Sequence, residues 1–166
     1  MENIIITLVC ITILIIGVGM IAMNLFNSMD MLAYAWKECE AKSGEVRCTR
    51  ISAVSSNTTA PGTQANLTIK NEGQIDLAYF DKWDVIVKYQ SGVVQRLPYT
   101  TNTPGWSVGG IYINGLPEVY EPNIFNPNET MKLILKLSPP VASKTVNLAT
   151  ISTPNGVSTE MVFGPP

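Results

Sequence analysis

The most informative part of the chain is the segment IIITLVCITILIIGVGMIAM, which runs from Ile4 to Met23. It carries no charge, and apart from Thr7 and Thr12 every residue is apolar or glycine. About 20 such residues form a helix of about 30 Å, the thickness of a bilayer's hydrocarbon core. A helix that is apolar on every side must be surrounded by lipid or by protein. The segment therefore predicts a transmembrane anchor or the packed core of an assembly.

The helix is expected to continue beyond this segment. From Asn24 to Ala41, apolar residues recur at steps of three or four, at Leu25, Met29, Leu32 and Trp36. Neither Gly nor Pro occurs between Gly19 and Gly44, so we expect one helix of about 40 residues that ends at Ser43-Gly44. An anchor needs only the first half, and the apolar stripe on the second half favours a parallel neighbouring copy. The residues expected to pack in such a core are Ile4, Leu8, Ile11, Ile15, Leu25, Met29, Leu32 and Trp36.

Two cysteines flank the expected end of the helix. Cys39 and Cys48 bracket the polar sequence EAKSGEVR, which is predicted to turn into the first strand. A disulfide here would close a loop of about ten residues and stabilise the fold by about 3 kcal/mol. We predict this bridge, with two free thiols as the alternative, and it indicates an oxidising, extracellular location. Cys10 lies in the apolar segment and is expected to be a small packed residue.

The charges around the apolar segment argue against an extracellular location of the large domain. Glu2 is the only charge before it, whereas Lys37, Lys42, Arg47 and Arg50 follow it. By the positive-inside rule alone, the large domain would stay in the cytoplasm. A basic leader removed before Met1 would reconcile this pattern with export.

The remainder of the chain, from Glu45 to Pro166, predicts strands and turns. Apolar and polar residues alternate in several short segments, and Asn155-Gly156 between two of them is a strong hairpin signal. The expected strands are 46–54, 65–70, 83–89, 93–99, 108–113, 131–137, 146–152 and 157–163. Seven or eight short strands without a second helix indicate an immunoglobulin-like antiparallel β-sandwich. The predicted class is therefore α+β, with a helical unit at 1–43 and a sandwich at 44–166.

The sandwich has enough apolar residues for a core of its own. The expected core consists of Leu67, Ile69, Trp83, Val85, Val87, Leu133, Leu135, Val146, Leu148, Met161 and Phe163. Trp106 is likewise expected in the core or as a loop anchor rather than as a carbohydrate platform.

Composition argues against catalysis and nucleic-acid binding. The 166 residues include no histidine, and 11 Lys and Arg against 13 Asp and Glu leave no basic excess. There is no Gly-rich phosphate loop and no Cys-x-x-Cys motif. We therefore expect no enzyme activity, no cofactor and no metal, and we interpret Asp76, Asp81, Asp84, Glu118 and Glu121 as surface charges.

Three Asn-x-Ser/Thr sequons are candidate N-glycosylation sites. Asn57 lies in a polar segment, Asn66 on the outward face of an expected strand, and Asn128 in an expected loop. All three are expected to be accessible, as glycosylation requires.

Four segments behind the apolar helix resemble the outer domains of archaeal-type flagellins (archaellins): ANLTIKNEGQIDL, KWDVIV, NPNETMKLILKL and TISTPNGVSTEMVF. The resemblance covers nearly the whole chain. It implies that N-terminal helices bundle into a filament core while sandwiches form the outer sheath. The implied function is that of a structural subunit of an extracellular motility filament. Its partners would be copies of itself, the membrane during export, and covalent glycans.

Two features of the N-terminal residues differ from the patterns usual in archaellins and type IV pilins. The chain begins Met1-Glu2-Asn3, whereas archaellins commonly begin with small or apolar residues, and Ile5 stands where type IV pilins usually carry glutamate. The alternative is a membrane-anchored archaellum stator or surface-layer-binding module, because such proteins share the layout of one apolar helix and one sandwich.

Overall fold

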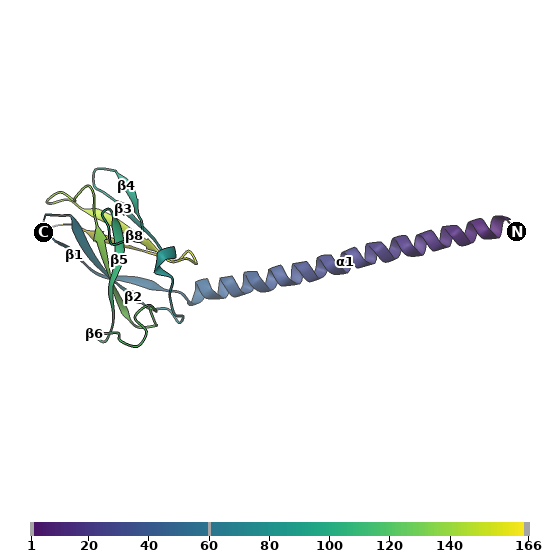
Figure 1. Ribbon diagram of the computed structural model, residues 1–166, viewed down its shortest axis with the longest axis horizontal. Helices are drawn as coiled ribbons and strands as arrows, with labels where there is room; N and C mark the ends of the chain where they lie inside the picture. The colour runs from purple at the N-terminus through teal and green to yellow at the C-terminus, as the bar shows by residue number, and fades with distance from the viewer. Residues whose placement is uncertain (1, 60, 165–166) are drawn as a thin grey trace. The chain divides into compact units, whose positions relative to one another are not determined.

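The computed structural model describes residues 2–59 and 61–164. One long helix is followed by antiparallel sheets, so the predicted α+β class is confirmed (Figure 1). The chain divides into two compact units, with the boundary between Ser43 and Gly44.

Helix α1 spans Glu2–Cys48, so the predicted end at Ser43-Gly44 is wrong. Gly44 stays helical because the last carbonyl groups find partners further along the chain. The hydroxyl and the backbone N–H of Thr49 both donate to the carbonyl of Glu45, at 2.8 and 3.0 Å. The carbonyl of Cys48 accepts the backbone N–H of Gln74 at 2.7 Å. Since these bonds satisfy the helix end, a glycine stop is not needed.

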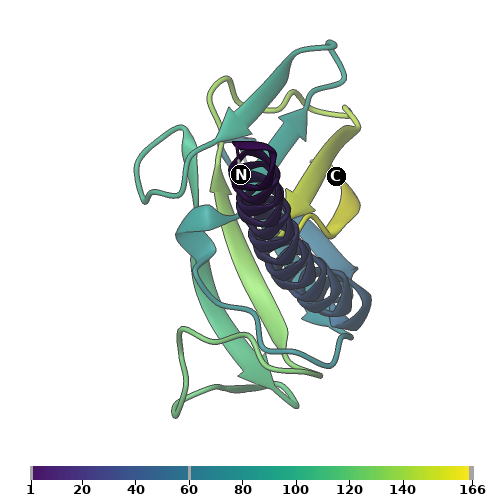
Figure 2. The same cartoon turned by 90° about the vertical axis from the view of Figure 1, so that its right-hand side faces the viewer.

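The second unit is a sandwich of two antiparallel sheets. The five-stranded sheet has the order β1-β2-β7-β5-β6, and the four-stranded sheet has the order β4-β3-β8-β9. The strands are β1 Ile51–Thr59, β2 Gln64–Asn71, β3 Asp84–Lys88, β4 Val94–Leu97, β5 Gly105–Ile113, β6 Leu116–Pro117, β7 Thr130–Lys136, β8 Asn147–Ser152 and β9 Ser158–Phe163. A short 3-10 helix, η1, covers Phe80–Lys82. At one side β1 (blue) and β9 (yellow) meet (Figure 2), and the Ser56 hydroxyl donates to the Val162 carbonyl at 2.9 Å.

The core confirms most of the predicted set and corrects two members. Val146 and Leu148 were expected inside, but Val146 is 62 % exposed and Leu148 lies half-buried on the outer face. The inward residues of β8 are Asn147, Ala149 and Ile151. The pairing Val87–Ala149 fixes this register, and a shift of one residue exchanges the two faces of a strand. Buried Asn147 is tolerated because its Oδ1 accepts the backbone N–H of Gln90 at 3.1 Å.

Candidate functional site

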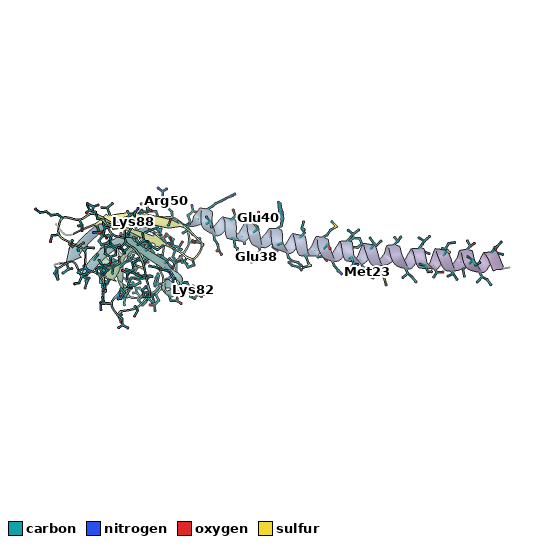
Figure 3. The ribbon with its side chains drawn as sticks, turned by 90° about the horizontal axis from the view of Figure 1, so that it is seen from above. Met23, Glu38, Glu40, Arg50, Lys82 and Lys88 are labelled. Atoms are coloured by element: carbon teal, nitrogen blue, oxygen red, sulfur yellow. The ribbon has the colours of Figure 1, made fainter. Side chains whose placement is uncertain are left out.

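The candidate functional surface is the side-chain surface of α1. Every residue described from Asn3 to Ile21 is exposed, and Figure 3 shows side chains projecting from the helix around Met23. The hydroxyls of Thr7, Thr12 and Ser28 donate to the carbonyls four residues earlier, at 2.7, 2.6 and 2.8 Å. Because their polar atoms are bonded within the helix, these residues add little polarity to its surface. By length and composition, α1 is a helix capable of spanning a membrane.

The apolar surface is longer than a bilayer requires. Large exposed apolar side chains occur from Ile4 to Trp36, which corresponds to about 50 Å of helix. A hydrocarbon core is about 30 Å thick. About 20 Å of apolar helix therefore extends beyond the hydrocarbon core when the helix crosses it along the membrane normal.

In the second half of the helix the apolar side chains are not confined to one stripe, contrary to the prediction. Phe26, Met31 and Tyr34 are exposed large side chains away from the predicted stripe, because successive residues turn by about 100°. The predicted stripe includes some of the apolar residues but misses these three. Apolar side chains therefore lie on several sides of this half of the helix, with polar residues such as Asn27 and Asp30 between them, and they need neighbours on more than one side.

All eight predicted packing residues lie on this surface, each more than half exposed in the single chain: Ile4, Leu8, Ile11, Ile15, Leu25, Met29, Leu32 and Trp36. Their packing against another copy stays a prediction.

The predicted bridge between Cys39 and Cys48 is absent from the structure. Cys10, Cys39 and Cys48 are all free cysteines. The segment between Cys39 and Cys48 is helical rather than a turn, and nine helical residues separate the two Cα atoms by about 13 Å. Disulfides require Cα atoms within about 7 Å. The bridge would thus demand unwinding of the end of α1, so it is no longer an argument for an oxidising compartment.

The three sequons occupy different environments. Asn57 and Asn66 are direct partners in the β1–β2 register, and both point away from the core. Asn57 is exposed on the edge strand, whereas Asn66 is half-buried and its Oδ1 accepts a 3.2 Å hydrogen bond from the Gln64 amide. Asn128 is exposed in a turn with φ 69°. Use of these sites stays a prediction.

No metal-binding cluster of three or more His, Cys, Asp or Glu occurs in residues 2–59 and 61–164. Of the acidic residues interpreted as surface charges, Asp84 pairs with Arg96 at 2.6 Å. Glu118 instead organises its own loop: its carboxylate accepts the backbone N–H groups of Tyr120 at 2.7 Å and Glu121 at 3.3 Å. These hydrogen bonds, chiefly the one from Tyr120, lower the pKa of Glu118.

Both tryptophans assigned to the core are buried. Trp83 donates its indole N–H to the Ala78 carbonyl at 3.1 Å, and Trp106 packs edge-on against Tyr99 with ring centroids 4.8 Å apart. Neither indole ring is therefore available as a surface platform for carbohydrate.

Comparison by sequence finds no matching family model and no matching curated protein. Solved structures do match. The archaellum periplasmic stator protein FlaG from Sulfolobus acidocaldarius superposes with a TM-score of 0.56 at 22 % identity, over 69 % of this chain and 99 % of that chain. The archaeal flagellin FlaB1 from Methanocaldococcus jannaschii gives 0.56 at 10 % identity, over 71 % and 90 %. The archaeal flagellum of Methanospirillum hungatei gives 0.51 at 14 % identity, over 91 % and 90 %.

These likenesses define the class of fold. The chain has an archaellin-like fold, a long N-terminal helix followed by an antiparallel sandwich, as the sequence resemblance implied. The similar structures come from a stator protein as well as from filament proteins, and they are structural proteins rather than enzymes.

Proposed function

We propose that this protein is the structural subunit of an extracellular, archaellum-like motility filament that polymerises through α1. The observation that carries the proposal is the length of the apolar surface. It continues to Trp36, about 20 Å beyond the thickness of a bilayer's hydrocarbon core, and it covers more than one side of the helix. Copies of the same helix, packed in parallel, would bury this surface on all sides.

The sandwich supports the same proposal because it has its own core and does not need α1 to cover it. Its buried apolar residues all come from Ile51 onward. In the proposed filament the helices form the core and the sandwiches lie outside. The membrane would hold α1 before assembly, and covalent glycans would be added to the exposed domain.

A stator is the second candidate. It is favoured by the likeness to FlaG, a periplasmic stator protein. Of FlaG, FlaB1 and the Methanospirillum hungatei flagellum, FlaG has the highest sequence identity to this chain. A stator would need α1 only as a membrane anchor, and that function does not require the apolar residues between Leu25 and Trp36.

Leu32→Lys tests the proposal, with Leu32→Met as the volume-matched control. A lone charge in a packed apolar core is costly, so we expect no filaments from Leu32→Lys and normal filaments from Leu32→Met. Electron microscopy of sheared surface fractions from producing cells is the measurement. Normal filaments from Leu32→Lys, or none from the unmodified chain, would count against a polymer built through α1.

A further inference from the structure

Asp30 is an isolated charge on the apolar surface of α1. No other charged residue occurs between Glu2 and Lys37, and the helix neighbours of Asp30 include Phe26 and Tyr34 at four residues' distance. Within the described residues its carboxylate makes no hydrogen bond or ion pair. In a bundle of helices this carboxylate would lose water, and a charge removed from water is strongly destabilising unless it is paired.

Lys37 is the matching cation. It lies seven residues after Asp30, which places it about 20° around the helix and about 10 Å along it, on the same side. Lys37 is exposed and, within the described residues, also lacks an ion pair. The next cation, Lys42, already pairs with Glu38 at 2.8 Å. Asp30 and Lys37 therefore lie one heptad apart on the same side of α1, and neither makes an ion pair within the described residues.

We propose that Asp30 of one copy pairs with Lys37 of a neighbouring parallel copy, displaced by about one heptad, and that this pair sets the register of the helices. The inference rests on the proposed polymerisation through α1. The partner of this helix surface is a second copy of the chain, because a parallel α1 shifted by seven residues brings Asp30 and Lys37 together. The attraction between apolar side chains is non-directional, so a pair of opposite charges adds a more specific determinant of the register.

Charge reversal tests the pair. Asp30→Lys and Lys37→Asp, each alone, should lower filament yield at least about tenfold, because each leaves like charges facing within the bundle. The double variant Asp30→Lys/Lys37→Asp should recover filaments to within about twofold of the unmodified chain. Glu40→Lys is the matched control: it makes the same charge change on the same helix and should preserve assembly (Figure 3).

The outcomes separate this inference from the function on which it rests. Filament yield is measured by quantitative electron microscopy, and unfolding of the sandwich is followed in parallel to establish that each variant is folded. Normal filaments from Asp30→Lys, or a double variant as poor as the single variants, would overturn the ion pair and leave polymerisation standing. An unmodified chain that forms no filaments would overturn the polymer itself. Filaments recovered in the double variant but not in either single variant would establish the ion pair.

Discussion

The amide of Asn71 joins two segments of the sandwich that lie 54 residues apart: its Nδ2 donates to the carbonyl of Phe125 at 2.9 Å. The same Nδ2 donates to the carbonyl of Ile75 at 3.0 Å, and its Oδ1 accepts the backbone N–H of Gly73 at 2.9 Å. Asn71 is fully buried at the end of β2. One side chain therefore fixes both the turn after β2 and the segment that leads into β7.

Asn71→Asp should destabilise the sandwich by about 2–4 kcal/mol. Aspartate keeps the shape and the acceptor but places a carboxylate against two carbonyl oxygens that have lost their donor. Urea unfolding of the purified protein measures the change. Asn123→Asp, which adds the same charge in an exposed loop, should stay within about 0.5 kcal/mol of the unmodified protein. Equal stabilities for the two variants would show that the Asn71 bonds are dispensable.

Glu129 gives the sandwich a pH dependence. The residue is 1 % exposed, and its Oε2 accepts the backbone N–H of Asn126 at 2.7 Å. Burial, chiefly, raises the pKa of Glu129, and the nearby Glu118 carboxylate adds to the rise. Because the folded pKa lies above the unfolded value, protonation favours the folded state. This contribution is complete below pH 4.5 and is lost as the pH rises through the raised pKa.

Glu129→Gln should therefore raise the free energy of unfolding at pH 7 by about 1 kcal/mol and have a smaller effect at pH 4. Glutamine still accepts the Asn126 N–H and carries no charge. Urea unfolding at the two pH values is the measurement, with exposed Glu160→Gln as the control. A larger gain at pH 4 than at pH 7 would mean that the buried carboxyl does not titrate as described.

The sequence was sufficient for the class of fold because a long uncharged apolar segment is followed by short segments in which apolar and polar residues alternate. Leu133 and Leu135 alternate with Lys132 and Lys136, and the structure buries the apolar pair. The sequence was insufficient at the junction of α1 and β1, because hydrogen bonds to residues far along the chain determine where the helix ends and the strand begins. The Cys48 carbonyl meets the Gln74 N–H, so the helix persists through Gly44 and the predicted first strand begins only at Ile51.

The candidate site was predictable in outline only. Composition alone identifies α1 as apolar, but the predicted stripe omitted side chains such as Met31, whose place on another face follows from the turn of about 100° per residue. The β8 register was likewise hidden, since apolar Val146 and Leu148 compete with Ala149 and Ile151 for the inward face. Pairing with β3 determines the result, and that pairing is not encoded locally.

The opposition of Asn57 and Asn66 predicts that only one of them carries a glycan. Directly opposed residues have Cβ atoms about 5 Å apart, too close for two oligosaccharides. Asn57 is the more exposed and lies on the edge strand, so modification of the folded domain should fall on Asn57 and Asn128. Glycopeptide mass spectrometry of protein from producing cells tests this. Asn57→Gln should remove one glycan and Asn66→Gln none, whereas a glycan found on Asn66 would contradict the prediction.

The last prediction is that the sandwich folds without the helix and does not assemble. Its buried apolar residues all lie between Ile51 and Phe163. The cut belongs before Gly44, because Cys48 and Thr49 bond to Gln74 and Asn155 of the sandwich, at 2.7 and 2.6 Å.

A chain of residues 44–166 should be monomeric in sedimentation and unfold in one cooperative urea transition. Cys48→Ser is made in the same chain to prevent disulfide-linked dimers. A second chain of residues 50–166 is the matched comparison: it lacks the end of α1, including the Cys48 carbonyl and the Thr49 hydroxyl, and should be less stable by about 1–3 kcal/mol. Fibres from either chain would place assembly in the sandwich, through an edge strand such as β1 or β4, and would reduce α1 to an anchor. Failure of the 44–166 chain to fold would show that α1 contributes to the stability of the domain, although its own residues from Asn3 to Ser43 supply none of the buried core.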